Sequence, residues 1–139
     1  MSTVPDLRRA YRTAIYTIGP PVAVRIVIGR RNPAADRVLA ALDCYRRWAI
    51  VTPCNPASVR LSDADNRGRL RRMAGAIARA RIRHCAARSQ SPEGDWIEPG
   101  YCLFDLSEPA ALALARRFGQ RAIVAGVLDG PATLRWTGL

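Results

Sequence analysis

The 139-residue sequence contains no lysine, a single histidine and few aromatic residues, which make up 6% of the chain. Its longest apolar run, residues 122–128, is interrupted by one glycine and is too short to cross a bilayer. No apolar segment follows the arginines near the N-terminus, so we expect no secretory signal. These absences predict a cytoplasmic protein that does not enter a membrane.

The sequence also lacks the paired spacings that hold structural metals. Its four cysteines, Cys44, Cys54, Cys85 and Cys102, are separated by 10, 31 and 17 positions, and the only histidine is His84. Neither a CxxC nor an HxxxH spacing occurs, and the common phosphate-loop, nucleophile-elbow and metalloprotease motifs are missing. We therefore predict free thiols, mostly buried, with no metal and no cofactor.

Positive charge is what the sequence has in excess. The sequence contains 22 arginines and 11 acidic residues, which gives a net charge of +11. The exclusive use of arginine is typical of a GC-rich genome, but codon choice does not explain the excess over acids. Residues 60–88 alone hold nine arginines and two aspartates. Such a surface attracts polyanions, and a solvated basic face is the simpler alternative.

Hydrophobic periodicity and capping signals predict an alternation of short strands and helices. The expected helices cover residues 5–12, 32–44, 62–82 and 108–119. The expected strands cover residues 13–18, 22–29, 48–51, 81–88, 101–106, 122–130 and 132–136. Together they predict one α+β domain over residues 1–139. Its sheet is mixed and mostly antiparallel, with about six or seven strands, and three or four helices pack mainly on one face.

The longest expected helix has a clear start. Ser62 is followed three residues later by Asp65, a short version of the capping box, so Ser62 is predicted to be the N-cap. Leu70, Met73 and Ile77 recur at spacings of three and four, so we expect them to be buried.

Four strings follow one another along the chain: TPCNPAS (52–58), LSDADN (61–66), DWIEPG (95–100) and FGQRAI (118–123). In this order they resemble the landmarks of a bacterial family of small uncharacterised proteins, a domain-of-unknown-function family with Asn-Pro-x-Ser, Trp-x-Glu-Pro and Phe-Gly-Gln-x-Ala-Ile segments. AYRTAIY (10–16) and RIVIG (25–29) also fit, so the resemblance spans nearly the whole chain. Pro53-Cys54 and Gly100 depart from the pattern, which has a small-aromatic pair and a serine there. The resemblance implies site positions and no reaction.

The positions that the resemblance implies are Asn55, Ser58, Asn66, Trp96, Glu98 and Gln120. The loop 52–58 leaves a buried strand and enters a helix N-terminus, where free N–H groups and nearby arginines such as Arg67 favour an anion. Burial of Glu98 against Trp96 would raise the pKa of its carboxyl group and suit it to proton transfer. Two structural explanations are the alternatives to a functional site. The polar side chains of the loop can bond to neighbouring backbone groups, and Glu98 can be a solvated carboxylate that pairs with an arginine.

These positions predict a small domain that binds or acts on an anionic small molecule. Glu98 is its candidate catalytic residue, and its candidate ligand-binding residues are Asn55, Ser58, Asn66, Arg67, Trp96 and Gln120. The alternative is a basic module that contacts nucleic acid or an acidic protein through the arginine-rich helix 62–82. A cysteine hydrolase built from Cys54, His84 and Asn55 has the weakest support. The test of a shared pocket is whether residues 55, 98 and 120 meet.

Overall fold

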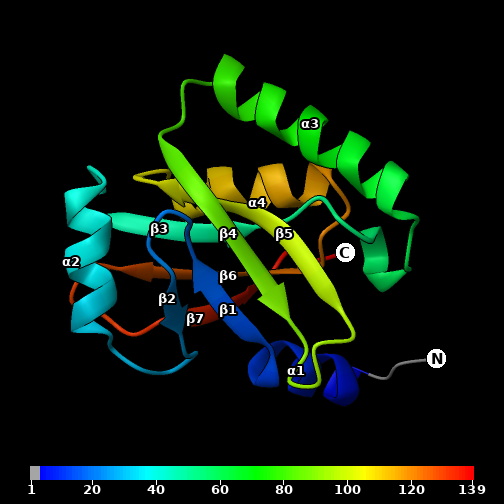
Figure 1. The fold of residues 1–139 in the computed structure, drawn as a ribbon, viewed down its shortest axis with the longest axis horizontal. Coiled ribbons are helices and arrows are strands. Elements are labelled where there is room, and N and C mark those ends of the chain that lie inside the picture. Colours follow the sequence, from blue (N-terminus) through cyan, green and yellow to red (C-terminus); the bar gives the residue numbers. More distant parts are fainter. Residues whose placement is uncertain (1–3) are drawn as a thin grey trace.

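A computed structural model describes residues 4–139 and contains four α-helices, one short 3-10 helix and seven strands (Figure 1). The helices are α1 (Val4–Thr13), α2 (Pro33–Ala41), η1 (Pro56–Ser58), α3 (Asp63–Arg79) and α4 (Glu108–Arg117). The strands are β1 (Ile15–Ile18), β2 (Val24–Ile26), β3 (Arg47–Val51), β4 (His84–Gln90), β5 (Ile97–Phe104), β6 (Ala122–Val127) and β7 (Thr133–Trp136). The predicted α+β class and the predicted numbers of strands and helices are confirmed.

All seven strands belong to one sheet of order β2-β1-β4-β5-β3-β6-β7, and each neighbouring pair is antiparallel. The sheet curls until its two edges meet just beyond β2 and just before β7. There Ile28 and Ala132 form an isolated parallel bridge, and the Gly29 N–H donates to the Ala132 carbonyl over 2.7 Å. The curled sheet therefore has a concave inner face and a convex outer face.

Helices lie on both faces of the sheet, whereas the sequence predicted them mainly on one. On the inner side Leu39 of α2 packs against Ile50, and on the outer side Met73 of α3 packs with Val51 and residues of α4. Strand β3 explains the difference, because Trp48–Val51 are buried without alternation. A strand that is apolar on both sides needs cover on both sides.

The local signals for helix starts are confirmed. Ser62 is the N-cap of α3, and its hydroxyl accepts from the Asp65 N–H over 3.1 Å. Met73 and Ile77 are fully buried, while Leu70 is only half-buried. None of the helices in the described part of the chain is long and apolar enough to cross a bilayer.

Strand β5 begins earlier than the sequence suggested, which moves Glu98 from a predicted loop into a strand. Residues 84–90 and 97–104 form a long hairpin in which Glu98 pairs with Ser89. Pro99 is tolerated because pairing between β5 and β3 reaches only to Tyr101, so no partner strand needs the N–H that proline lacks. Glu98 consequently sits on rigid backbone.

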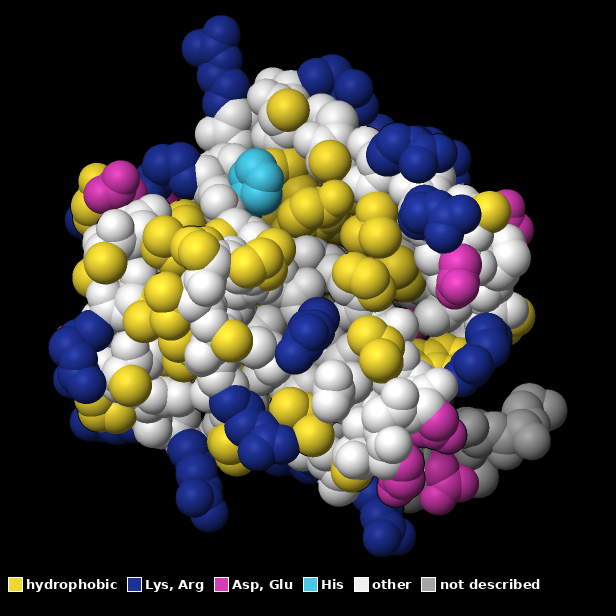
Figure 2. All heavy atoms as spheres, viewed as in Figure 1, with side chains coloured by type: hydrophobic (Ala, Val, Ile, Leu, Met, Phe, Trp, Pro, Cys, Tyr) yellow, Lys and Arg dark blue, Asp and Glu magenta, His cyan; other side chains and the backbone are white. Residues whose placement is uncertain are grey.

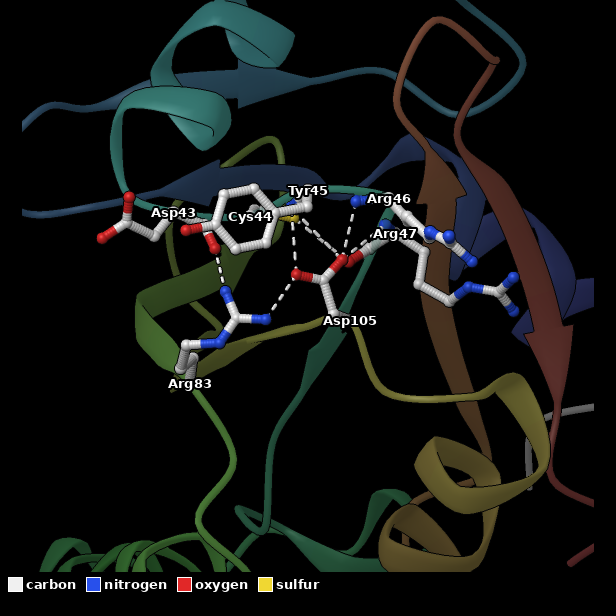
Figure 3. A network of polar contacts seen from close by, with 7 residues as sticks. All are labelled: Asp43, Cys44, Tyr45, Arg46, Arg47, Arg83 and Asp105. Atoms are coloured by element: carbon white, nitrogen blue, oxygen red, sulfur yellow. Dashed lines mark hydrogen bonds and ion pairs between the residues drawn. The ribbon is translucent and has the colours of Figure 1, made fainter.

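A carboxylate network fixes the other end of β5 (Figure 3). Asp105 follows the strand directly and accepts from three consecutive backbone N–H groups, those of Tyr45, Arg46 and Arg47, over 2.6–3.2 Å. Arg83 adds an ion pair with Asp105 at 2.7 Å. Burial alone would raise the pKa of Asp105, but these donors lower it to about 2. The network ties the start of β3 to the start of β4 and the end of β5.

Candidate functional site

A cavity of about 330 Å³ lies on the inner face of the sheet. Its walls come from α1, from strands β1, β3, β4, β5 and the start of β6, from the turn between β4 and β5, and from the loop that leaves β3 and forms η1. Figure 1 shows α1 below the sheet beside the β4–β5 turn, where it covers this end of the inner face. Most of the wall is apolar, and a small number of polar groups converge on the interior. This composition is typical of small-molecule sites.

The structure brings five of the seven predicted site residues to the cavity wall: Asn55, Ser58, Trp96, Glu98 and Gln120. These residues come from three segments far apart in the sequence. Asn66 does not line the cavity and instead bonds to Asn55 from behind. Arg67 is exposed on α3 and is not part of the wall. The predicted meeting of residues 55, 98 and 120 is therefore present.

Asn55 is the organising side chain of the site. Its Nδ2 donates to Glu98 Oε2 over 2.9 Å. Its Oδ1 accepts from the Leu61 N–H over 2.8 Å and from Asn66 Nδ2 over 2.9 Å. Asn66 Oδ1 in turn accepts from the Asn55 N–H over 3.0 Å, and Asn55 is only 7% exposed. Asn55 has φ 50°, a left-handed conformation that asparagine tolerates better than most residues.

Glu98 is a partly buried carboxyl group with few donors. Burial raises the pKa of Glu98, and hydrogen bonds with Asn55 and Trp96 oppose that rise only in part. On the sheet, Tyr16 and Glu98 both pair in register with Ser89, so all three residues point to the same face and line the cavity. Glu98 therefore faces a cavity in which its proton affinity is increased.

Two residues that sequence reasoning missed, Tyr11 and Arg121, line the same cavity as Glu98. Burial raises the pKa of Tyr11 to about 12, and the charge of Glu98 adds to the rise, while a hydrogen bond with Ser58 and the charge of Arg121 oppose it. Arg121 Nη2 donates to the Ala57 carbonyl over 3.3 Å, and its buried Nε has no hydrogen-bond partner among the described residues. Both lie within strings that carried the resemblance, but nothing in those strings indicated which side chains turn inward.

Gln120 mainly positions the cavity wall. Its Oε1 accepts from the Thr52 N–H over 2.9 Å, which joins the turn between α4 and β6 to the residue that follows β3. Thr52 Oγ1 donates to the Pro99 carbonyl over 2.6 Å. The first bond holds the start of the 52–58 loop against the turn before β6, and the second holds it against β5, next to Glu98.

The residues of the cysteine-hydrolase alternative do not form a site. Cys54 lies in the cavity wall, where burial raises the pKa of its thiol. His84 is exposed, with its ring against Tyr101 and its Nδ1 3.1 Å from the Ile82 carbonyl oxygen. All four cysteines are free thiols in the structure, and three are buried. Within residues 4–139 no cluster of three or more metal-binding side chains is present.

Gly100 permits a close approach beside the cavity. A Cβ at this position would lie 2.1 Å from the Val51 carbonyl oxygen and 3.1 Å from Thr52. A serine, as in the family pattern, therefore requires the backbone of β3 or β5 to move. In this chain glycine lets β5 lie tightly against the end of β3.

Comparison with known proteins identifies a family. A family model described as a protein of unknown function (DUF3293) matches residues 51–123, a stretch that includes the 52–58 loop, Glu98 and Arg121. No curated protein and no solved structure matches the chain.

Proposed function

Because the chain belongs to the DUF3293 family, whose description assigns no activity, we propose a function from the geometry of the cavity. The cavity binds a small molecule that carries an anionic group, and Glu98 exchanges a proton with that molecule. The observation that carries the proposal is the meeting of Asn55, Glu98 and Arg121 around one cavity of about 330 Å³. Local turn chemistry gives no reason for these three segments to converge.

Arg121 supports an anionic ligand. It lines the cavity, and its Nε lacks an acceptor among the described residues although it is buried. A buried donor without a partner costs about 1–3 kcal/mol. A carboxylate or phosphate oxygen that takes up this guanidinium removes that penalty, and charge assistance strengthens the bond.

Glu98 and Tyr11 support proton transfer. A carboxyl group whose pKa is raised holds a proton closer to neutral pH, which suits it to act as a general acid or base. Tyr11, with a pKa of about 12, stays protonated at neutral pH and offers a hydrogen-bond donor beside it. The Asn55 amide fixes the carboxyl group without fully compensating its burial.

A thermal-shift panel of short carboxylates and phosphate monoesters, each paired with its neutral amide or alcohol counterpart, tests the binding step. We expect at least one anionic compound to raise the melting temperature and its neutral counterpart to have no effect. The Arg121→Gln variant should lose this response. Arg116→Gln is the matched control, because Arg116 also donates to a backbone carbonyl, that of Thr137, but lies outside the cavity.

The Glu98→Gln variant separates binding from proton chemistry. If Glu98 exchanges a proton with the ligand, the affinity of the wild-type protein depends on pH and that of the variant does not. Identical pH dependence of the two proteins contradicts the role of Glu98, and a panel in which neutral and anionic compounds behave alike contradicts the anionic ligand.

A further inference from the structure

A second site lies on the outer side of the molecule, where α3 passes over the end of α4. A surface cleft of about 370 Å³ is lined there by five arginines, Arg69, Arg71, Arg72, Arg79 and Arg117. No acidic residue lines it. Figure 2 shows basic side chains along the outer edge of the molecule above α3. We propose that this arginine cleft binds the phosphate backbone of a nucleic acid.

The arginines of the cleft are not neutralised by carboxylates. The two ion pairs found among the described residues involve Arg83 and Arg135, neither of which lines the cleft. Arg71, Arg72 and Arg79 are exposed. Several like charges held together without counter-charges repel one another, and an incoming polyanion relieves that repulsion.

The floor of the cleft is fixed. Arg69 Nε donates to the Pro53 carbonyl over 2.5 Å, and its Nη2 donates to the Phe118 carbonyl. The guanidinium groups of Arg69 and Arg117 lie 6.0 Å and 5.6 Å from the centre of the Phe118 ring. Phe118 is buried and thus provides a fixed apolar base beneath the guanidinium groups of Arg69 and Arg117.

Two glycines of α3 space the remaining charges along the helix. Guanidinium nitrogens of Arg71 and Arg72 lie 3.8 Å and 3.7 Å from the Cβ position of Gly68. A guanidinium nitrogen of Arg79 lies 3.2 Å from that of Gly75. These glycines are seven positions apart, so the two groups of charge share one helix face and lie about 10 Å apart along the axis.

The spacing favours a chain of phosphates over a single anion. One phosphate ion cannot contact guanidinium groups about 10 Å apart, whereas successive phosphates of a strand can. Arginine forks bind phosphate oxygens in a bidentate manner, and a nucleic-acid strand presents its phosphates at a regular spacing along the cleft. No aromatic side chain is exposed in the cleft for stacking on bases, so we expect binding with little sequence preference.

The test measures fluorescence anisotropy of a labelled 20-nucleotide single strand at several salt concentrations. Two triple variants remove the same charge: Arg71, Arg72 and Arg79 to Gln in the cleft, and the exposed Arg30, Arg31 and Arg37 to Gln near α2 as the control. We expect the cleft variant to bind at least tenfold more weakly and to reduce the slope of log affinity against log salt by about 2. The control should stay within threefold of wild type.

Three results overturn the proposal. One is an equal loss of affinity in both triple variants, which assigns the binding to net charge and not to the cleft. Another is binding of poly-glutamate as tight as that of the oligonucleotide. The third is wild-type binding with no salt dependence. Unchanged melting temperatures of both variants verify that exposed arginines were replaced without unfolding, and the cavity panel above is independent of all these outcomes.

Discussion

Two carboxyl groups seven positions apart mark opposite ends of β5 and have opposite properties. Asp105 follows the strand and is surrounded by three backbone N–H groups and the Arg83 guanidinium. Glu98, near the start of the strand, has hydrogen bonds with Asn55 and Trp96 only. Burial tends to raise the pKa of both groups, but only at Asp105 do the donors prevail.

The number of hydrogen-bond donors thus decides whether a partly buried carboxyl group at the end of this strand has a lowered or a raised pKa. Asp105 is ionised at all ordinary pH values, and its charge is used to connect loops. Glu98 keeps part of its burial penalty and can gain or release a proton under milder conditions. The same strand therefore has a carboxyl group with a lowered pKa at one end and a carboxyl group with a raised pKa at the other.

Replacing Asp105 with Ala should have the largest effect on stability. Three backbone donors and Arg83 lose their charged acceptor, so the free energy of unfolding should fall by about 3 kcal/mol. Urea unfolding at pH 7 measures this change in the free energy of unfolding. The control is Asp63→Ala in the first turn of α3, which should cost less than about 1 kcal/mol. If both variants lower the free energy of unfolding equally, the Asp105 network contributes no more to stability than a single surface carboxylate in the first turn of a helix.

The Asp105 network also predicts that the folded protein loses stability at low pH. The folded pKa of Asp105, about 2, lies below the ordinary value of 3.8, so its contribution is complete above pH 4. It is lost as pH falls from 4 through 2. Urea midpoints measured from pH 6 to pH 2 should decline in this window for wild type, and the decline should be much smaller for the Asp105→Ala variant.

Replacing Asn55 with Ala should have the next largest effect. The change leaves the Leu61 N–H and Asn66 Nδ2 without their acceptor, which should lower the free energy of unfolding by about 2 kcal/mol. Because the Asn55 bond lowers the pKa of Glu98, its loss should raise that pKa further. Carboxyl-carbon NMR titration measures the shift. Asn32→Ala, which removes the N-cap of α2, should leave the Glu98 titration unchanged.

Replacing Glu98 with Gln should have the smallest effect and the opposite sign. Since the folded pKa of Glu98 is raised, ionisation in the folded state opposes folding as pH rises above the ordinary value of 4.5. The variant should therefore be more stable than wild type at pH 7, by less than the Asn55→Ala variant is destabilised. The difference should vanish below pH 4.

Glu108→Gln provides the contrast for that experiment. Glu108 pairs with Arg135 at 2.7 Å on the surface, so its removal should be neutral or slightly destabilising at pH 7. If Glu98→Gln is the more destabilising of the two at pH 7, the carboxyl group at the start of β5 carries no burial penalty and the comparison with Asp105 fails.

Features that depend on neighbouring residues could be predicted from the sequence. Ser62, Asn32 and Ser107 are N-caps because a side-chain oxygen needs only to reach an N–H three residues ahead. The hairpin at Asp129-Gly130 likewise follows from the left-handed conformation that this dipeptide accepts. The strand and helix inventory rests on such signals.

Features that depend on long-range packing were predicted only in part. The strings of the resemblance indicated Asn55, Glu98 and Gln120 but not that α1 covers them, so Tyr11 was missed. Arg67 was included for its charge, yet a helix turns its side chain toward solvent. Which face a side chain takes depends on the curl of the sheet, and no short segment contains that information.

The meeting of the sheet edges at Ile28 and Ala132 also bears on how copies of this protein behave toward one another. Unpaired strand edges are templates for intermolecular β-pairing, aggregation and domain swapping. Here the edge strands β2 and β7 have only three and four residues, and the chain beyond one bonds to the chain before the other. The curl that shapes the cavity thus also leaves little backbone on which a second molecule could extend the sheet.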